Sequence, residues 1–234
     1  MQRLRQRILE PELLPTAPES DARANLRDLS RINRWLGGYG VMKREIRRWR
    51  SSQEPFLLLD IGSGNGDFAR YLQQAFPRAR LVSCDLKLLH LRDAPWPKLV
   101  ADVRDLPFRE RSFDVVTCNL LLHHFTDPEI VRLLRELAKL SRGQLLVNDL
   151  ERHPLAYAFL PATLFLFDWH PITIHDGMRS VAAGFRPAEL LALAQQAGLT
   201  HVCVRRHLPW FRLSLCGIPP ASSRLGQNGP AELD

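Results

Sequence analysis

The chain has 234 residues, is 45% hydrophobic and 24% charged, and carries a formal net charge of +7. The length suits one domain with a normal core, and the lack of any run of about 20 apolar residues argues against a membrane-spanning helix. The four cysteines lie far apart without metal-ligand spacing, so we expect no metal site and a reduced, cytoplasmic setting.

Arginine supplies nearly all of the positive charge and is spread along the whole chain. A basic balance can indicate nucleic acid or acidic lipid as a partner. Arginine is concentrated near both ends of the first fifty residues, but an arginine-rich solvated surface is the favoured interpretation. A nucleic-acid partner is therefore not favoured, and at most peripheral membrane contact is expected.

The N-terminal fifth of the chain has two parts. Residues 1–19 are polar and contain three prolines, which predicts a flexible arm. From Ser20 to Arg50 the apolar residues recur at helical spacing, with a break at Gly37 and Gly38. This pattern predicts that residues 20–50 form one or two amphipathic helices, which together make an N-terminal helical cap.

A buried strand at 56–61 then leads into a glycine turn. Gly62, Gly64 and Gly66 alternate before a helix that starts near Asp67, so bare backbone N–H groups lie where a ligand can approach. The third glycine comes one residue too early for the dinucleotide pattern G-x-G-x-x-G. Asp67 would repel a pyrophosphate but would tolerate a cationic ligand. A tight turn without a ligand remains an alternative.

Strands and helices alternate along the rest of the chain. This order predicts an α/β fold with a parallel sheet covered on both faces. An apolar segment at 154–167 and a loop around His170–Gly177 precede the last helix, and the tail from 219 is expected to be flexible. The remaining predicted strands are 80–84, 99–101, 113–118, 144–148, 200–206 and 210–216, the last two as an antiparallel hairpin, and the helices are 66–76, 128–140 and 187–197.

Four motifs, taken together and in this order, resemble those of the class I S-adenosylmethionine-dependent methyltransferases. The resemblance covers roughly residues 50–216 and is strongest with the small-molecule branch of quinone and natural-product enzymes. It implies a Rossmann-like, mostly parallel seven-stranded sheet with a C-terminal antiparallel hairpin, in a domain at 51–218 with a substrate lid around 151–182. The motifs are D-I-G-S-G-N-G at 60–66, Asp85, A-D-V at 101–103 and F-D-V-V at 113–116 leading into N-L-L-L-H-H-F at 119–125.

The resemblance implies S-adenosyl-L-methionine as cofactor and S-adenosyl-L-homocysteine as product. Asp85 would accept the ribose hydroxyls, Leu86 would pack on the adenine, and Asp102 and the backbone of Val103 would meet its edge. Arg34 is a candidate for the methionyl carboxylate. Asp85 could instead cap the next helix, and Asp102 could hold a turn. The residues implied for the methionyl end are Asp60, Gly62, Gly64, Gly66 and Asn119.

Two histidines are candidates for a catalytic base. His123 follows the strand at 113–118, and His175 precedes Asp176 in the lid region; imidazole suits proton abstraction near neutral pH. The apolar segment predicts an apolar, aromatic or polyketide-like acceptor of secondary metabolism. That segment either roofs the pocket or touches a membrane.

O-methylation is favoured over C-methylation of a quinone-type lipid. A nucleic-acid methyltransferase and a non-catalytic binding protein are less favoured alternatives. The oligomeric state stays open, with a dimer among the alternatives.

Overall fold

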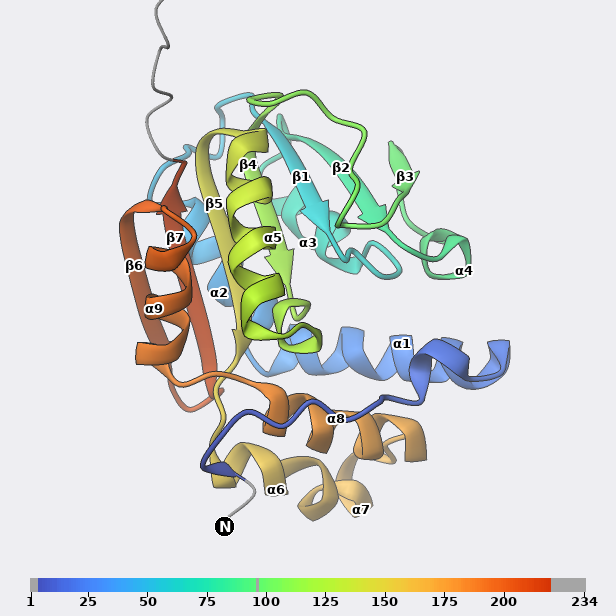
Figure 1. Cartoon of the computed structure of the whole chain (residues 1–234). Coiled ribbons are helices and arrows are strands. Elements are labelled where there is room, and N and C mark those ends of the chain that lie inside the picture. Colours follow the sequence, from blue (N-terminus) through green and yellow to red (C-terminus); the bar gives the residue numbers. More distant parts are fainter. Residues whose placement is uncertain (1–3, 96, 220–234) are drawn as a thin grey trace, which may run out of the picture.

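The computed structural model describes residues 4–95 and 97–219, which form a seven-stranded sheet in the order β3-β2-β1-β4-β5-β7-β6 (Figure 1). The first five strands run parallel, and β7 is antiparallel to both of its neighbours. This confirms the predicted sheet with its C-terminal hairpin. The strands are β1 (Leu57–Ile61), β2 (Arg80–Asp85), β3 (Lys98–Val100), β4 (Phe113–Asn119), β5 (Ser141–Leu150), β6 (Thr200–His207) and β7 (Arg212–Ile218).

Helices cover both faces of the sheet, and each face has its own apolar core. On one face, α5 and α9 pack against the central strands, and on the other α2 and α3 do so (Figure 1). The helices are α1 (Glu19–Trp35), α2 (Gly38–Ile46), α3 (Asp67–Ala75), α4 (Leu88–Leu91), α5 (Asp127–Leu140), α6 (Pro154–Ala162), α7 (Leu164–Phe167), α8 (Pro171–Ala183) and α9 (Pro187–Gln196).

The glycine turn connects β1 to α3 with a backbone that side chains rarely adopt. Gly62, Gly64 and Gly66 all have positive φ angles, of 69°, 54° and 73°. A Cβ atom on Gly66 would also lie 2.8 Å from the Cα atom of Ala94. Glycine is therefore required here both for conformation and for close packing.

The helix α1 lies beyond the carboxyl ends of the central strands, and α6, α7 and α8 lie farther from the sheet than α1 does (Figure 1). The space between the strand ends and these helices is where ligands of open α/β sheets bind. No helix among the described residues is long and apolar enough to cross a membrane.

The loop predicted around His170–Gly177 is wrong, because these residues lie in or next to α8. Pro171 begins the helix, and the His170 side chain accepts a hydrogen bond from the Ile172 N–H. Gly177 does not break the helix. A Cβ atom there would lie 2.2 Å from Cδ1 of Leu160 on α6, so the glycine lets the two lid helices approach closely.

The N-terminal segment was expected to be flexible, but residues 4–18 pack along α8 (Figure 1). The backbone N–H groups of Leu13 and Leu14 each donate a 2.9 Å hydrogen bond to the carboxylate of Asp176. Arg7 donates to the carbonyl oxygens of Phe125 and Ala183. The predicted flexible tail falls almost entirely on residues 220–234, outside the described residues.

Candidate active site

A cavity of about 640 Å³ lies beyond the carboxyl ends of the central strands. Its walls come from the glycine turn, the loops after β2 and β4, the helices α1 and α2, the lid and the β6–β7 turn. This volume is typical of a small-molecule site. The sequence-predicted residues that line it are Asp60, Gly62, Gly64, Asp85, Leu86, Asn119 and His123; Gly66, Asp102, Val103 and His175 are not part of its lining.

Asp85, the last residue of β2, is hydrogen-bonded to the glycine turn. Its carboxylate accepts hydrogen bonds from the Gly64 N–H at 2.9 Å and the Lys87 N–H at 3.1 Å, and lies 3.1 Å from Nδ1 of His90. Burial raises the pKa of Asp85, but the His90 and Lys87 contacts outweigh it and the pKa is lowered. The carboxylate is therefore charged, and it holds the turn in place as well as facing the cavity.

Asp60 is a second buried carboxyl group at the strand ends. It is 1% exposed and accepts a 2.8 Å hydrogen bond from the Thr117 hydroxyl. Burial raises its pKa to about 7, partly opposed by Thr117 and reinforced by the charge of Asp85. A cation in the cavity would favour the charged form. On the neighbouring strand, Asn119 accepts a hydrogen bond from the Asn148 side chain at 2.6 Å.

Asp102 and Val103 are not part of the cavity lining. The carboxylate of Asp102 accepts hydrogen bonds from the Arg104 N–H at 2.9 Å and from its Nη2 at 2.7 Å. These bonds lower the pKa of Asp102 to about 2. Val103 packs against the core, while Leu86 is 59% exposed at the cavity edge. The predicted contacts of Asp102 and Val103 with an adenine ring remain predictions.

His123 is buried at the other end of the cavity and is bonded to Asp149. Its Nδ1–H donates to Oδ1 of Asp149 at 2.7 Å, so Nε2 is left free to accept a proton. Burial lowers the pKa of His123, but the charge and hydrogen bond of Asp149 outweigh it and the pKa is raised. This is the arrangement of a base held in position by a carboxylate.

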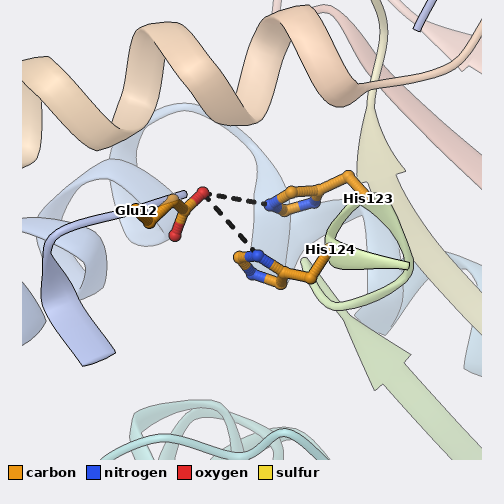
Figure 2. Close-up of side chains that lie close together, drawn as sticks. All are labelled: Glu12, His123 and His124. Carbon is orange, nitrogen blue, oxygen red and sulfur yellow. Dashed lines mark ion pairs between the residues drawn. The ribbon is translucent and has the colours of Figure 1, made fainter. Parts of the chain in front are cut away.

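Glu12 reaches the same place from the N-terminal segment. Its Oε1 lies 3.9 Å from Nε2 of His123 and 3.7 Å from Nδ1 of His124, and it accepts a 2.6 Å hydrogen bond from the Ser180 hydroxyl (Figure 2). Burial raises the pKa of Glu12 and lowers that of His124 to about 3. The ligand atoms of these three side chains lie within 4.8 Å of one another, so they could also hold a metal ion, which the sequence analysis did not expect.

The other two basic candidates from the sequence are not at the cavity. Nδ1 of His175 lies 2.8 Å from the Asp176 carboxylate and 2.8 Å from Nη1 of Arg179. It is Asp176, not His175, that lines the cavity. Arg34 is exposed on α1. The geometry therefore favours His123 over His175 as the base.

Three polar residues of the site were missed from the sequence: Glu12, Asp149 and Arg212. Asp149 lies near the carboxyl end of β5, where the rule for open α/β sheets places ligands, but the predicted strand ended at residue 148. Arg212 begins β7, is 2% exposed and lines the cavity. Neither Glu12 nor Arg212 has a local motif that marks it.

Residues 59–147 match the family described as a methyltransferase domain. The chain is 31% identical over 103 residues to a demethylmenaquinone methyltransferase of Thermotoga maritima, covering 41% of this chain and 44% of that protein. It is 29% identical over 155 residues to a ubiquinone biosynthesis O-methyltransferase of Neisseria meningitidis serogroup C, covering 61% and 63%. The chain thus spans less than two thirds of the length of either relative.

The fold is also similar to that of a solved structure. The plantazolicin methyltransferase BpumL, solved in complex with SAH, superposes with a TM-score of 0.64. The match covers 88% of this chain and 93% of that one at 14% sequence identity. At this identity the likeness shows a shared fold.

Proposed function

Because the chain belongs to the class I S-adenosylmethionine-dependent methyltransferases, we propose that it methylates a hydroxyl oxygen of an apolar, aromatic or polyketide-like small molecule. One observation carries the proposal. A single cavity joins the glycine turn of the family motif to the buried His123–Asp149 pair. The first end suits the methyl donor, and the second suits removal of a proton from the acceptor.

The residues present fit S-adenosylmethionine at its ribose and methionyl ends. Asp60 and Asp85 place two carboxyl groups beside the glycine turn, where a donor with a sulfonium and an ammonium group brings positive charge. Burial, reinforced by the charge of Asp85, raises the pKa of Asp60 to about 7, so a cationic group bound at this end would favour the charged form of Asp60. The methionyl end would be held by Asp60, Gly62 and Asn119, and the ribose by Asp85.

When bound, S-adenosylmethionine supplies an electrophilic methyl group on sulfur and leaves as S-adenosylhomocysteine. The chain has to align the acceptor oxygen, exclude water and receive a proton. Nε2 of His123 accepts that proton, and Asp149 orients the ring and stabilises the imidazolium. Oε1 of Glu12 lies 3.9 Å from the same nitrogen and lines the same part of the cavity, where it would face the acceptor.

The inner face of the lid supports an apolar acceptor. Phe159, Leu160 and Val181 line the cavity from α6 and α8. On the outer side, Phe165 and Leu166 of α7 are 96% and 77% exposed. The segment at 154–167 therefore has both a cavity-facing and a solvent-facing apolar side. Peripheral membrane contact, a cytoplasmic location and a role in secondary metabolism stay proposals.

The proposal predicts S-adenosylhomocysteine binding and methyl transfer in a screen of phenols, hydroxyquinones and polyketides read by mass spectrometry. NMR of the product then shows whether the new methyl group is on oxygen or on carbon. Calorimetry without S-adenosylhomocysteine binding would refute the cofactor assignment. Methylation exclusively at carbon would replace O-methylation by the quinone-type alternative.

Donor binding is also predicted to release protons through Asp60. Its pKa of about 7 should fall when a cationic group binds nearby, so at pH 7 about half a proton should leave per bound ligand. Calorimetry of S-adenosylhomocysteine binding in buffers of different ionisation enthalpy measures this number. In Asp60→Asn the release should disappear; equal release in both proteins would show that another group titrates.

A further inference from the structure

Arg212 is a buried cation that the methyl-transfer chemistry described above does not use. It begins β7, where its backbone pairs with Leu150 of β5 and His207 of β6. Its side chain is 2% exposed and lines the cavity. Such a position is unusual, because a buried charge is normally paired with an opposite charge.

The hydrogen bonds of this guanidinium are incomplete. Among the described residues, Nε and Nη1 have no hydrogen-bond partner. Nη2 donates a long bond of 3.3 Å to the side-chain oxygen of Asn33 on α1. A guanidinium has five N–H donors, and leaving most of them unpaired in a buried place is costly. These donors point to a ligand that carries acceptor oxygens.

Among the described residues, no carboxylate is bonded to the guanidinium of Arg212. The charge of Asp149 raises the pKa of Arg212, but the oxygens of Asp149 are bonded to His123 and to the Leu150 N–H. The pKa of Arg212 is lowered by burial to about 10, so the guanidinium is still charged at neutral pH. The charge of Asp149 partly compensates that of Arg212, but the hydrogen-bond donors Nε and Nη1 of the guanidinium stay unpaired among the described residues.

We propose that Arg212, together with Asn33, binds an acidic group of the methyl acceptor, separate from the oxygen that is methylated. The inference rests on the proposed function and names its substrate class, which is an apolar acceptor with a carboxylate or a similarly acidic oxygen. Arginine suits such a group because its donors match a planar oxyanion.

Charge and position favour the acceptor over the donor as the source of this oxyanion. The sulfonium and ammonium groups of the donor are matched by Asp60 and Asp85 at the glycine turn, which is the other end of the cavity from Asp149. An acidic group of the acceptor is therefore the ligand that suits the guanidinium. Arg212 also follows Trp210 and Phe211, which line the cavity from the β6–β7 turn, and it lies beside the strand end that carries Asp149.

The test compares acids with their methyl esters as ligands of the full chain. Calorimetry would titrate protein saturated with S-adenosylhomocysteine with a panel of alkyl-substituted hydroxybenzoic acids and the corresponding esters. We expect the wild type to bind at least one acid about tenfold more tightly than its ester, a difference of about 1.4 kcal/mol. If no acid in the panel exceeds its ester, the proposal is wrong.

Variants then assign the preference to the guanidinium. Arg212→Met should abolish the preference while S-adenosylhomocysteine affinity stays within about threefold, and Arg212→Lys should keep part of it. Arg80→Met is the matched control, because Arg80 is exposed at the opposite end of the sheet, and it should change neither quantity. Weaker S-adenosylhomocysteine binding by Arg212→Met with an intact acid preference would assign Arg212 to the donor and overturn the proposal.

Two further measurements test the proposal if a variant does not fold or the donor product does not bind. Should Arg212→Met fail to fold, the wild-type comparison and Asn33→Ala, which should weaken the acid preference, still test the inference. Should the wild type not bind S-adenosylhomocysteine, the proposed function fails. Titration of the ligand-free protein with the same acids and esters would then test the Arg212 proposal separately, so the two failures can be told apart.

Discussion

Replacing His123 with glutamine is expected to lower kcat about 100- to 1000-fold, the usual contribution of a general base. The glutamine keeps the polar contact with Asp149 but cannot take a proton from the acceptor. Methyl transfer to a phenolic acceptor found in the screen, measured under saturating donor, gives the value. Full turnover near neutral pH would show that His123 is not the base.

The pH dependence of the wild type gives a second measure of the same role. Because the pKa of His123 is raised, its neutral, proton-accepting form should dominate only above the usual value of about 6.5, and kcat should rise with pH through that range. Asp149→Asn removes the charge that opposes burial, so this limb should move to lower pH. If the rise of kcat with pH occurs at the same pH in Asp149→Asn as in the wild type, Asp149 does not set the pKa of the base.

A chelator control distinguishes proton transfer from metal chemistry at the same cluster. Dialysis of the protein against EDTA is expected to leave turnover unchanged if Glu12, His123 and His124 act without a metal. Loss of turnover that a divalent ion restores would instead assign the cluster to a metal ion.

Asp85→Ala is expected to weaken S-adenosylhomocysteine binding about 30- to 100-fold, which corresponds to a loss of about 2 to 3 kcal/mol from hydrogen bonds to a charged group. The carboxylate already holds the Gly64 and Lys87 N–H groups, so the variant also loosens the glycine turn. Calorimetry measures the affinity, and thermal unfolding of the ligand-free protein measures the structural part of the effect.

His90→Gln is the matched control for Asp85. It replaces the imidazole that lies 3.1 Å from the carboxylate by an amide that can still donate a hydrogen bond, and it keeps the carboxylate itself, so affinity should change by less than about threefold. If Asp85→Ala loses thermal stability but binds S-adenosylhomocysteine as before, Asp85 caps the turn and does not bind the ribose.

The sheet could be predicted from sequence because each strand and turn has a local pattern. The run at 57–61 followed by Gly62 placed β1 and α3 to within a residue. Gly177 is typical of a loop by its sequence, but it lies within α8 and contacts Leu160, which is distant in sequence. The contacts of Glu12 and Asp149 with His123 could not be predicted for the same reason. Tertiary packing brings these residues together, and their spacing along the chain does not indicate the contact.

Most of the acceptor end of the cavity comes from other stretches of the chain than the donor end. Asp60, Asp85 and His123 lie within the matched range 59–147, whereas Glu12, the lid and Arg212 lie outside it. Substitutions in the outer stretches can therefore alter the choice of acceptor while the machinery for the donor is inherited intact. Such an enzyme would acquire new acceptors through changes in the segments before residue 59 and after residue 147. Chimaeras that exchange these two segments between relatives should exchange acceptor preference.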